Sequence, residues 1–123
     1  MPKYRVLITG GSRGIGKAIA KRYGKAGHCV LTPSRNELDL NSTESILDYG
    51  KADNYEVDVL INNAGENIIN SISDISVSSW QQTLTVNLTA PFLLIQKISP
   101  HMTGNKWGRI VNISSIYSII SRK

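Results

Sequence analysis

The chain has 123 residues, of which 41% are hydrophobic, enough to bury the core of one domain with little room for a second. A formal net charge of +5 favours an anionic partner, such as a phosphate or a nucleic acid. The single cysteine, Cys29, excludes an internal disulfide framework and a multi-cysteine zinc site. Because no apolar run approaches the length of a signal-peptide core or a membrane span, we expect a cytoplasmic protein without a metal site or a membrane partner.

Taken in chain order, apolar β-branched runs alternate with amphipathic segments. The predicted strands cover 5–9, 29–32, 38–40, 57–62 and 108–115, and the third is very short. The predicted helices run from Ile15 to a stop at Gly27, from a cap at Asn41 to about Ala52, and from Ser79 to Met102 with a bend at Pro91. This alternation predicts one domain, 1–123, with an α/β fold: a Rossmann-type doubly wound parallel sheet that stops after the fifth strand. Ligands bind at the carboxyl ends of the strands in such sheets.

A glycine-rich turn lies between the first predicted strand and the first predicted helix. Gly10 would let the chain reverse, Gly14 would let the backbone approach a pyrophosphate, and Gly16 would let the helix pack close to the strand. The free N–H groups at the helix N-terminus would then face the anion. A plain tight turn is the alternative interpretation. The phosphate loop of nucleotide triphosphatases is excluded, because no hydroxyl follows Gly16-Lys17.

Four segments together have the order and spacing of a known family. They are the glycine turn 9–16, the turn Asn62-Asn63-Ala64-Gly65, the helix 80–88 with Asn87, and the strand 109–115 that ends in Ser114-Ser115. These segments resemble the short-chain dehydrogenase/reductase family over essentially the whole chain, but only the N-terminal part of a family member. The resemblance implies an NAD(P)-dependent oxidoreductase that transfers hydride between NADPH and a small carbonyl or alcohol substrate, 3-oxoacyl compounds included.

The resemblance also implies the site residues. Those implied to bind the cofactor are Gly10, Ser12, Arg13, Gly14, Ile15, Gly16, Ser34, Arg35, Asp39, Leu40, Asn63, Ala64, Gly65 and Ile113. Ser115 is implied to position the substrate carbonyl, and Asn87 to support a proton-relay water. A serine that ends a strand and an asparagine that bends a helix are the plain alternatives.

The end of the second predicted strand bears on the choice of dinucleotide. An NAD-selective site places a carboxylate there, whereas an NADP site needs positive charge for the 2′-phosphate. By resemblance this position is the neutral Ser34, followed by Arg35, and Arg13 in the glycine turn completes a two-arginine clamp. We therefore expect NADP to be favoured over NAD. Glu37 has the spacing of a ribose-binding acid, but we interpret it as a solvent-facing loop residue.

The family's Tyr-x-x-x-Lys pair does not occur in these 123 residues. Residues four places after the five tyrosines are Ile8, Gly27, Asp53, Val59 and Ser121. We therefore expect the chain to supply the cofactor-binding part of a longer protein and to be inactive alone. The strand 110–113, apolar on both faces, would then be an exposed edge that invites a homo-oligomer or another partner.

Two alternatives remain from the sequence. The first is a non-catalytic dinucleotide-binding or interaction module that ends naturally at Lys123. The second is a nucleic-acid-binding domain, based on the basic residues Lys17, Lys21, Arg22 and Lys25 along one helix. A solvated helix face explains these side chains, and no aromatic stacking platform accompanies them, so we expect no nucleic-acid partner.

Overall fold

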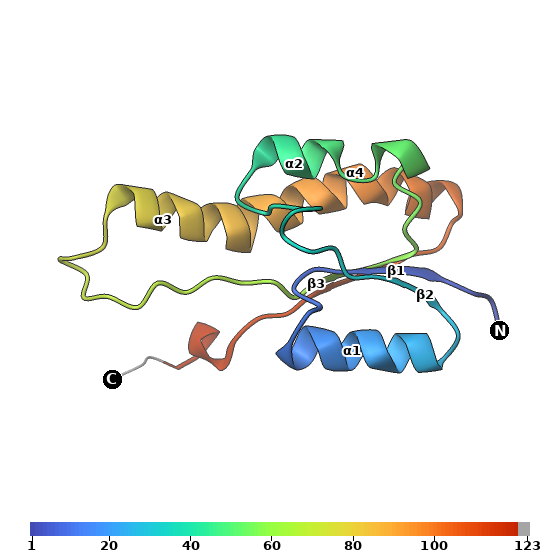
Figure 1. Ribbon diagram of the computed structural model, residues 1–123, viewed down its shortest axis with the longest axis horizontal. Coiled ribbons are helices and arrows are strands. Elements are labelled where there is room, and N and C mark those ends of the chain that lie inside the picture. The colour runs from blue at the N-terminus through green and yellow to red at the C-terminus, as the bar shows by residue number, and fades with distance from the viewer. Residues whose placement is uncertain (121–123) are drawn as a thin grey trace.

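The computed structural model describes residues 1–120. In this part of the chain a sheet of four parallel strands forms: β1 (Arg5–Ile8), β2 (Cys29–Leu31), β3 (Val59–Asn62) and β4 (Arg109–Asn112). The strand order is β2-β1-β3-β4, so the chain passes from β1 outward to β2 and then returns to β3 on the other side of β1 (Figure 1). This reversal between β1 and β3 confirms the predicted doubly wound α/β fold.

Helices cover both faces of the sheet. The helix α1 (Gly14–Lys25) lies on one face, and α2 (Thr43–Asp48) and α4 (Ala90–Gly104) lie on the other (Figure 1). The helix α3 (Val77–Leu84) continues the line of α4 toward the side where the strands end (Figure 1). In residues 1–120, no helix has both the length and the apolar character that a membrane crossing requires.

The core has two layers because side chains alternate across the strands. Leu7 and Leu60 point toward α2 and α4, where they pack with Ile46, Leu94 and Ile98. The opposite layer, under α1, is formed by the other apolar side chains of β1 and β3: Val6, Ile8, Val59 and Ile61. All of β3 is buried, which explains the near-continuous apolar run that identified it in the sequence.

The predicted third strand, 38–40, is wrong. The N–H groups of Glu37 and Leu38 donate to the carbonyl of Ser34 (3.1 and 2.9 Å), and the N–H of Asp39 donates to Oγ of Ser45 (2.9 Å). The N–H groups of Leu38 and Asp39 therefore bond to a tight turn and to α2, and not to a neighbouring strand. Leu38 is apolar for a different reason: it anchors this loop in the core with 4% of its surface exposed.

The boundaries of the second predicted helix also need correction. Ser42, and not Asn41, is the N-cap: its Oγ accepts the N–H of Ser45 at 3.1 Å. The helix α2 ends at Asp48, well before Ala52, because the next residue is extended and the hydroxyl of Tyr55 donates to the carbonyl of Leu47 (2.9 Å). A separate 3-10 turn, Lys51–Asp53, follows.

The long helix predicted over 79–102 is confirmed as one helical run from Val77 to Gly104, but it is not regular. A π turn, Thr85–Thr89, lies between α3 and α4. Pro91 has no N–H and cannot donate to the carbonyl four residues earlier, that of Asn87, so this α-helical hydrogen bond is missing just after the π turn. The irregularity predicted at Pro91 thus falls on the turn that precedes it.

The predicted exposed edge is confirmed for the part of the chain that the structure describes. There β4 pairs with β3 alone, and all four of its residues are exposed. Ile110 and Val111, whose side chains point to opposite faces, are 39% and 42% exposed. We call β4 and its unpaired side the open edge.

We expect Leu60→Ala to lower the free energy of unfolding by about 2–5 kcal/mol, because Leu60 is fully buried at the centre of the sheet and its truncation leaves a cavity. Ile72→Ala is the control, since Ile72 is 91% exposed and should change stability by less than about 0.5 kcal/mol. Urea unfolding monitored by circular dichroism measures both. Equal midpoints for the two variants would contradict the assigned core.

Candidate cofactor-binding site

Thr9 joins the end of β1 to the end of β3. Its side chain is nearly fully buried, and its Oγ1 accepts the N–H groups of Asn63 (3.1 Å) and Ala64 (3.0 Å). The side-chain amide of Asn63 donates in return to the carbonyls of Thr9 (3.0 Å) and Gly10 (3.1 Å). The glycine turn and the Asn-Asn-Ala-Gly turn are therefore one hydrogen-bonded unit at the point where the strand order reverses.

The glycine turn has the geometry that its sequence suggested. Gly10 and Gly14 have φ values of 66° and 55°, in the left-handed region that favours glycine. A Cβ on Gly16 would overlap the carbonyl oxygen of Gly10 and the side-chain amide of Asn63, so only glycine lets α1 approach this closely. A Cβ on Gly14 would meet no atom within 4 Å, which leaves the backbone there open to a ligand.

The N-terminus of α1 is also open. Arg13 is its N-cap residue, and its side chain makes no capping hydrogen bond. Ser12, Arg13 and Ile15 are exposed, and Ile15, at 63% exposure, does not join the buried face of α1. The unpaired N–H groups of the first helical turn and the helix dipole both favour an anion at this position.

The turn after β2 lies beside the glycine turn. A Cβ on Gly11 would overlap the methyl group of Thr32, so the two segments are in contact two residues before Ser34. The N–H and the hydroxyl of Ser34 both donate to Oε2 of Glu37, at 2.7 and 2.8 Å. These two bonds lower the pKa of Glu37 below its ordinary value. Glu37 is exposed, as expected, but it is bound to Ser34, which the sequence interpretation missed.

The remaining candidates of this turn interact with each other and with the core. Nε of Arg35 lies 3.6 Å from Oδ1 of Asp39, and the same oxygen accepts the N–H of Asn41 (3.0 Å). The side chain of Arg35 is 76% exposed, so this ion pair is weak and the arginine is free to turn toward another anion. Leu40 packs against the core layer under α2 and α4.

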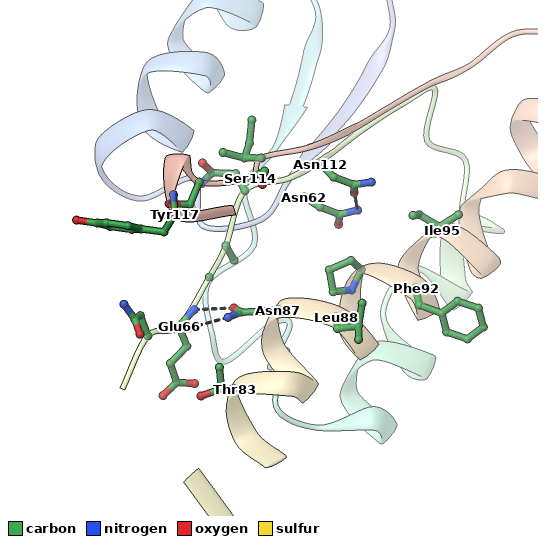
Figure 2. A pocket seen from close by; sticks show the side chains of 17 residues that line it. Asn62, Glu66, Thr83, Asn87, Leu88, Phe92, Ile95, Asn112, Ser114 and Tyr117 are labelled. Carbon is green, nitrogen blue, oxygen red and sulfur yellow. Dashed lines mark hydrogen bonds between the residues drawn. The ribbon is translucent and has the colours of Figure 1, made fainter. Parts of the chain in front are cut away.

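A cleft of about 800 Å³ opens at the carboxyl ends of β3 and β4 (Figure 2). Six of the candidate residues line it: Asn63, Ala64, Gly65, Asn87, Ile113 and Ser115. Leu88 and Ile95 form its helical side, and Ser114 and Tyr117 its β4 side (Figure 2). The glycine turn and the turn after β2 are not part of this lining, so the candidates form two groups that meet at Asn63.

Asn87 holds the segment after Gly65 against the helical run. Its Oδ1 accepts the N–H of Glu66 (2.8 Å), and its Nδ2 donates to the carbonyl of Glu66 (2.7 Å), as Figure 2 shows. Nε2 of Gln82 donates to the carboxylate of the same Glu66 (2.6 Å). Neither Glu66 nor Gln82 was a candidate. Glu66 contacts Asn87, 21 positions away, and Gln82, 16 positions away, and no local sequence pattern marks such contacts.

Two further asparagines pair beside the cleft, of which Asn62 is buried and Asn112 is exposed. Nδ2 of Asn62 donates to Oδ1 of Asn112 at 2.9 Å, across the β3–β4 pairing (Figure 2). Asn62 is 5% exposed, and its Oδ1 has no hydrogen-bond partner within the described residues. Both side chains line the cleft. The pair thus leaves a buried acceptor at the floor of the cleft.

Ser115 caps the short turn that follows β4. Its Oγ accepts the N–H of Tyr117 (3.2 Å), and its carbonyl accepts the hydroxyl of Ser118 (2.7 Å). A hydroxyl that accepts one bond still has its proton to donate. Ser115 can therefore donate to an oxygen in the cleft without losing its cap. Ile113 is fixed beside it by a bond from its N–H to the carbonyl of Asn62 (2.9 Å).

In residues 1–120, no three His, Cys, Asp or Glu side chains gather as a metal site would require. The parallel sheet, its reversal between β1 and β3, and a glycine turn that leads into an uncapped helix define a Rossmann-type α/β protein.

Comparison with known proteins identifies the family. The family model of the short chain dehydrogenases matches residues 4–53 and 38–122. The 3-oxoacyl-[acyl-carrier-protein] reductase FabG of Aquifex aeolicus is 34% identical over an alignment of 137 positions that covers 89% of this chain and 54% of that protein. Dehydrogenase/reductase SDR family member 6 of Aquarana catesbeiana is also 34% identical, over 94% of this chain and 53% of that protein. The chain belongs to the short-chain dehydrogenase/reductase family.

Solved structures agree with this assignment. A short-chain dehydrogenase from Streptomyces avermitilis superposes with a TM-score of 0.87 at 26% identity, over 97% of this chain and 52% of that one. A 4-hydroxyisoleucine dehydrogenase complexed with NADH gives a TM-score of 0.88 at 26% identity, over 98% and 59%. The chain thus spans about half the length of the relatives that it matches.

We expect Thr9→Val to lower the free energy of unfolding by about 1–3 kcal/mol, because valine keeps the shape but leaves the N–H groups of Asn63 and Ala64 without their acceptor. Thr43→Val, the same change at an exposed threonine, is the control. Chemical unfolding measures both variants. A Thr9→Val variant as stable as the control would show that the hydroxyl does not hold the two turns together.

Proposed function

We propose that the chain is the cofactor-binding part of an NADP-dependent oxidoreductase that transfers hydride between NADPH and a carbonyl or alcohol substrate. The observation that carries this proposal is the open glycine turn, tied through Thr9 to the Asn-Asn-Ala-Gly turn at the point where the strand order reverses. Family membership supports it, as do the names of two relatives, a 3-oxoacyl-[acyl-carrier-protein] reductase and an acetoacetyl-CoA reductase. Both names favour a 3-oxoacyl substrate.

The residues around the glycine turn fit a dinucleotide. The pyrophosphate would lie against the exposed backbone of Gly14, where the first N–H groups of α1 have no side-chain cap. Ser12 and Ile15 would flank it, while Gly10 and Gly16 keep the turn tight. The nicotinamide, when bound, supplies or accepts the hydride.

The preference for NADP over NAD depends on the end of β2. Arg35 is largely exposed and held only by a weak pair with Asp39, so it can turn to a 2′-phosphate. Ser34 has two donors, its N–H and its hydroxyl, both of which bond to Glu37 in the structure, and Arg13 lies exposed in the adjacent glycine turn. Asp39 and Leu40 would contact the adenine.

The cleft would receive the nicotinamide and the substrate carbonyl. Asn63, Ala64, Gly65 and Ile113 line its cofactor side, and Ser115 would donate its free hydroxyl proton to the carbonyl oxygen. Both polar atoms of the Asn87 side chain are bonded to Glu66. We therefore assign any support of a relay water to the main-chain carbonyl of Asn87, because Pro91, four residues later, has no N–H to donate to it. Because the 123 residues contain no Tyr-x-x-x-Lys pair, we expect no turnover by this chain alone.

We expect the chain to bind NADPH more tightly than NADH, and Arg35→Ala to weaken NADPH binding by about tenfold with little effect on NADH. Arg22→Ala, the same change in the last turn of α1, is the control and should leave both affinities unchanged. Fluorescence titration with NADPH and with NADH measures the affinities of the unmodified chain and of both variants. Equal binding of NADPH and NADH by the unmodified chain would refute the NADP preference but leave the dinucleotide site standing.

The open edge favours a second function, an interaction module. The N–H and C=O groups of Ile110 and Asn112 point away from β3, because alternate residues of a parallel strand face each neighbour and Arg109 and Ile113 already donate toward β3. We propose that the open edge pairs with a strand of another polypeptide, a second copy of the chain included.

We expect the chain to self-associate with increasing concentration, and Val111→Lys to shift it to the monomer by placing a charge on the open edge. Val77→Lys, at an apolar residue 74% exposed at the start of α3, is the control and should leave association unchanged. Sedimentation equilibrium measures the masses. A chain that stays monomeric at every concentration would exclude self-pairing.

A further inference from the structure

The turn after β2 contains an internal anion. The N–H and the hydroxyl of Ser34 donate to one oxygen of Glu37, at 2.7 and 2.8 Å, while the N–H groups of Glu37 and Leu38 return to the carbonyl of Ser34. The bond from the N–H of Ser34 to the Glu37 carboxylate is half of the Ser-x-x-Glu capping box of helix N-termini, but the hydroxyl of Ser34 donates to that carboxylate instead of accepting the N–H of Glu37. Here no helix follows, because residues 35–37 form a turn. The carboxylate therefore lies on the donors of Ser34 at the end of a strand.

The carboxylate of Glu37 lies where the proposed function requires donors for the 2′ substituent of the cofactor. The end of β2 is in contact with the glycine turn through Thr32 and Gly11. In the proposed dinucleotide site this is where the 2′ position of the adenosine ribose lies. NADP(H) brings a phosphate to that position and NAD(H) a hydroxyl. A phosphate needs the same two Ser34 donors that Glu37 already occupies.

We propose that Glu37 is a specificity-determining residue of the proposed site, an internal competitor that a 2′-phosphate must displace from Ser34. This inference rests on the proposed function. Each Ser34 donor has a single proton, so it cannot serve a carboxylate and a phosphate at full strength together. The two anions would also repel each other at this distance. Glu37 thus reduces the advantage that Arg35 and Ser34 give to NADP(H).

The surroundings of Glu37 allow this displacement. The residue is exposed, so its side chain can rotate into water without leaving a cavity. The turn itself does not depend on the carboxylate, because the N–H of Leu38 donates to the carbonyl of Ser34 (2.9 Å) and Leu38 is buried in the core. The lowered pKa of Glu37 keeps it ionised near neutral pH, where cofactor binding is measured. The competition is therefore electrostatic and local.

Two small probes isolate this contact. Adenosine 2′,5′-bisphosphate carries the 2′-phosphate and 5′-AMP lacks it, and isothermal titration calorimetry on the whole chain measures both. We expect Glu37→Ala to bind the bisphosphate about tenfold more tightly than the unmodified chain, with less than about a twofold change for 5′-AMP. Glu37→Gln, which keeps an acceptor but loses the charge, should fall between. Glu44→Ala, at an exposed acid of α2, is the control for the same change in net charge.

The outcomes separate this inference from the proposed function. If Glu37→Ala and Glu44→Ala bind the bisphosphate equally, Glu37 does not compete and the inference is wrong, while NADPH binding by the unmodified chain still supports the proposed function. If Glu37→Ala loses affinity for 5′-AMP and NADH instead, the carboxylate binds the ribose and the inference is also overturned. If the unmodified chain binds neither NADPH nor NADH, both fail. Circular dichroism of each variant checks that the fold is unchanged.

Discussion

The hydroxyl of Thr9 is the interaction on which the site depends. It accepts two backbone N–H groups from the turn after β3, while Asn63 donates back to the carbonyls of Thr9 and Gly10. These hydrogen bonds fix the positions of two turns, about 54 residues apart in sequence, relative to each other. Gly16 has no room for a side chain because this junction lies directly beneath α1. The same junction positions the open N-terminus of α1 and the end of the cleft that Asn63 and Ala64 line.

The site divides into a rigid part and an exposed part. Thr9 and Asn62 are buried at the ends of the central strands β1 and β3, and Asn62 bonds to Asn112 of β4. The turn that carries Ser34, Arg35 and Glu37 is exposed, and its polar contacts are short-range. A rigid centre suits the pyrophosphate and the nicotinamide, which all the proposed cofactors share. The exposed turn bears on the 2′ substituent, the part that distinguishes them.

Much of this arrangement could be read from local pattern. The apolar runs of β1 and β3 indicated the fold, and four motif segments in order indicated the family, and both are confirmed. Leu38 shows where pattern fails, because one apolar residue that anchors a loop looks the same as a short strand. Asn87 shows another limit: it was a candidate, but its partner Glu66 was not. A contact between residues 21 positions apart leaves no periodic signal.

The sequence by itself determined the parallel sheet, the glycine turn and the family, because near-continuous apolar runs and the spacing of short motifs are local properties of the chain. Only the tertiary structure decided which polar groups meet. It joined Thr9 to Asn63, Asn62 to Asn112 and Asn87 to Glu66, each pair across different elements. It also brought the carboxylate of Glu37 to the hydroxyl of Ser34. Such contacts depend on directions in space, which the fold fixes and residue spacing does not.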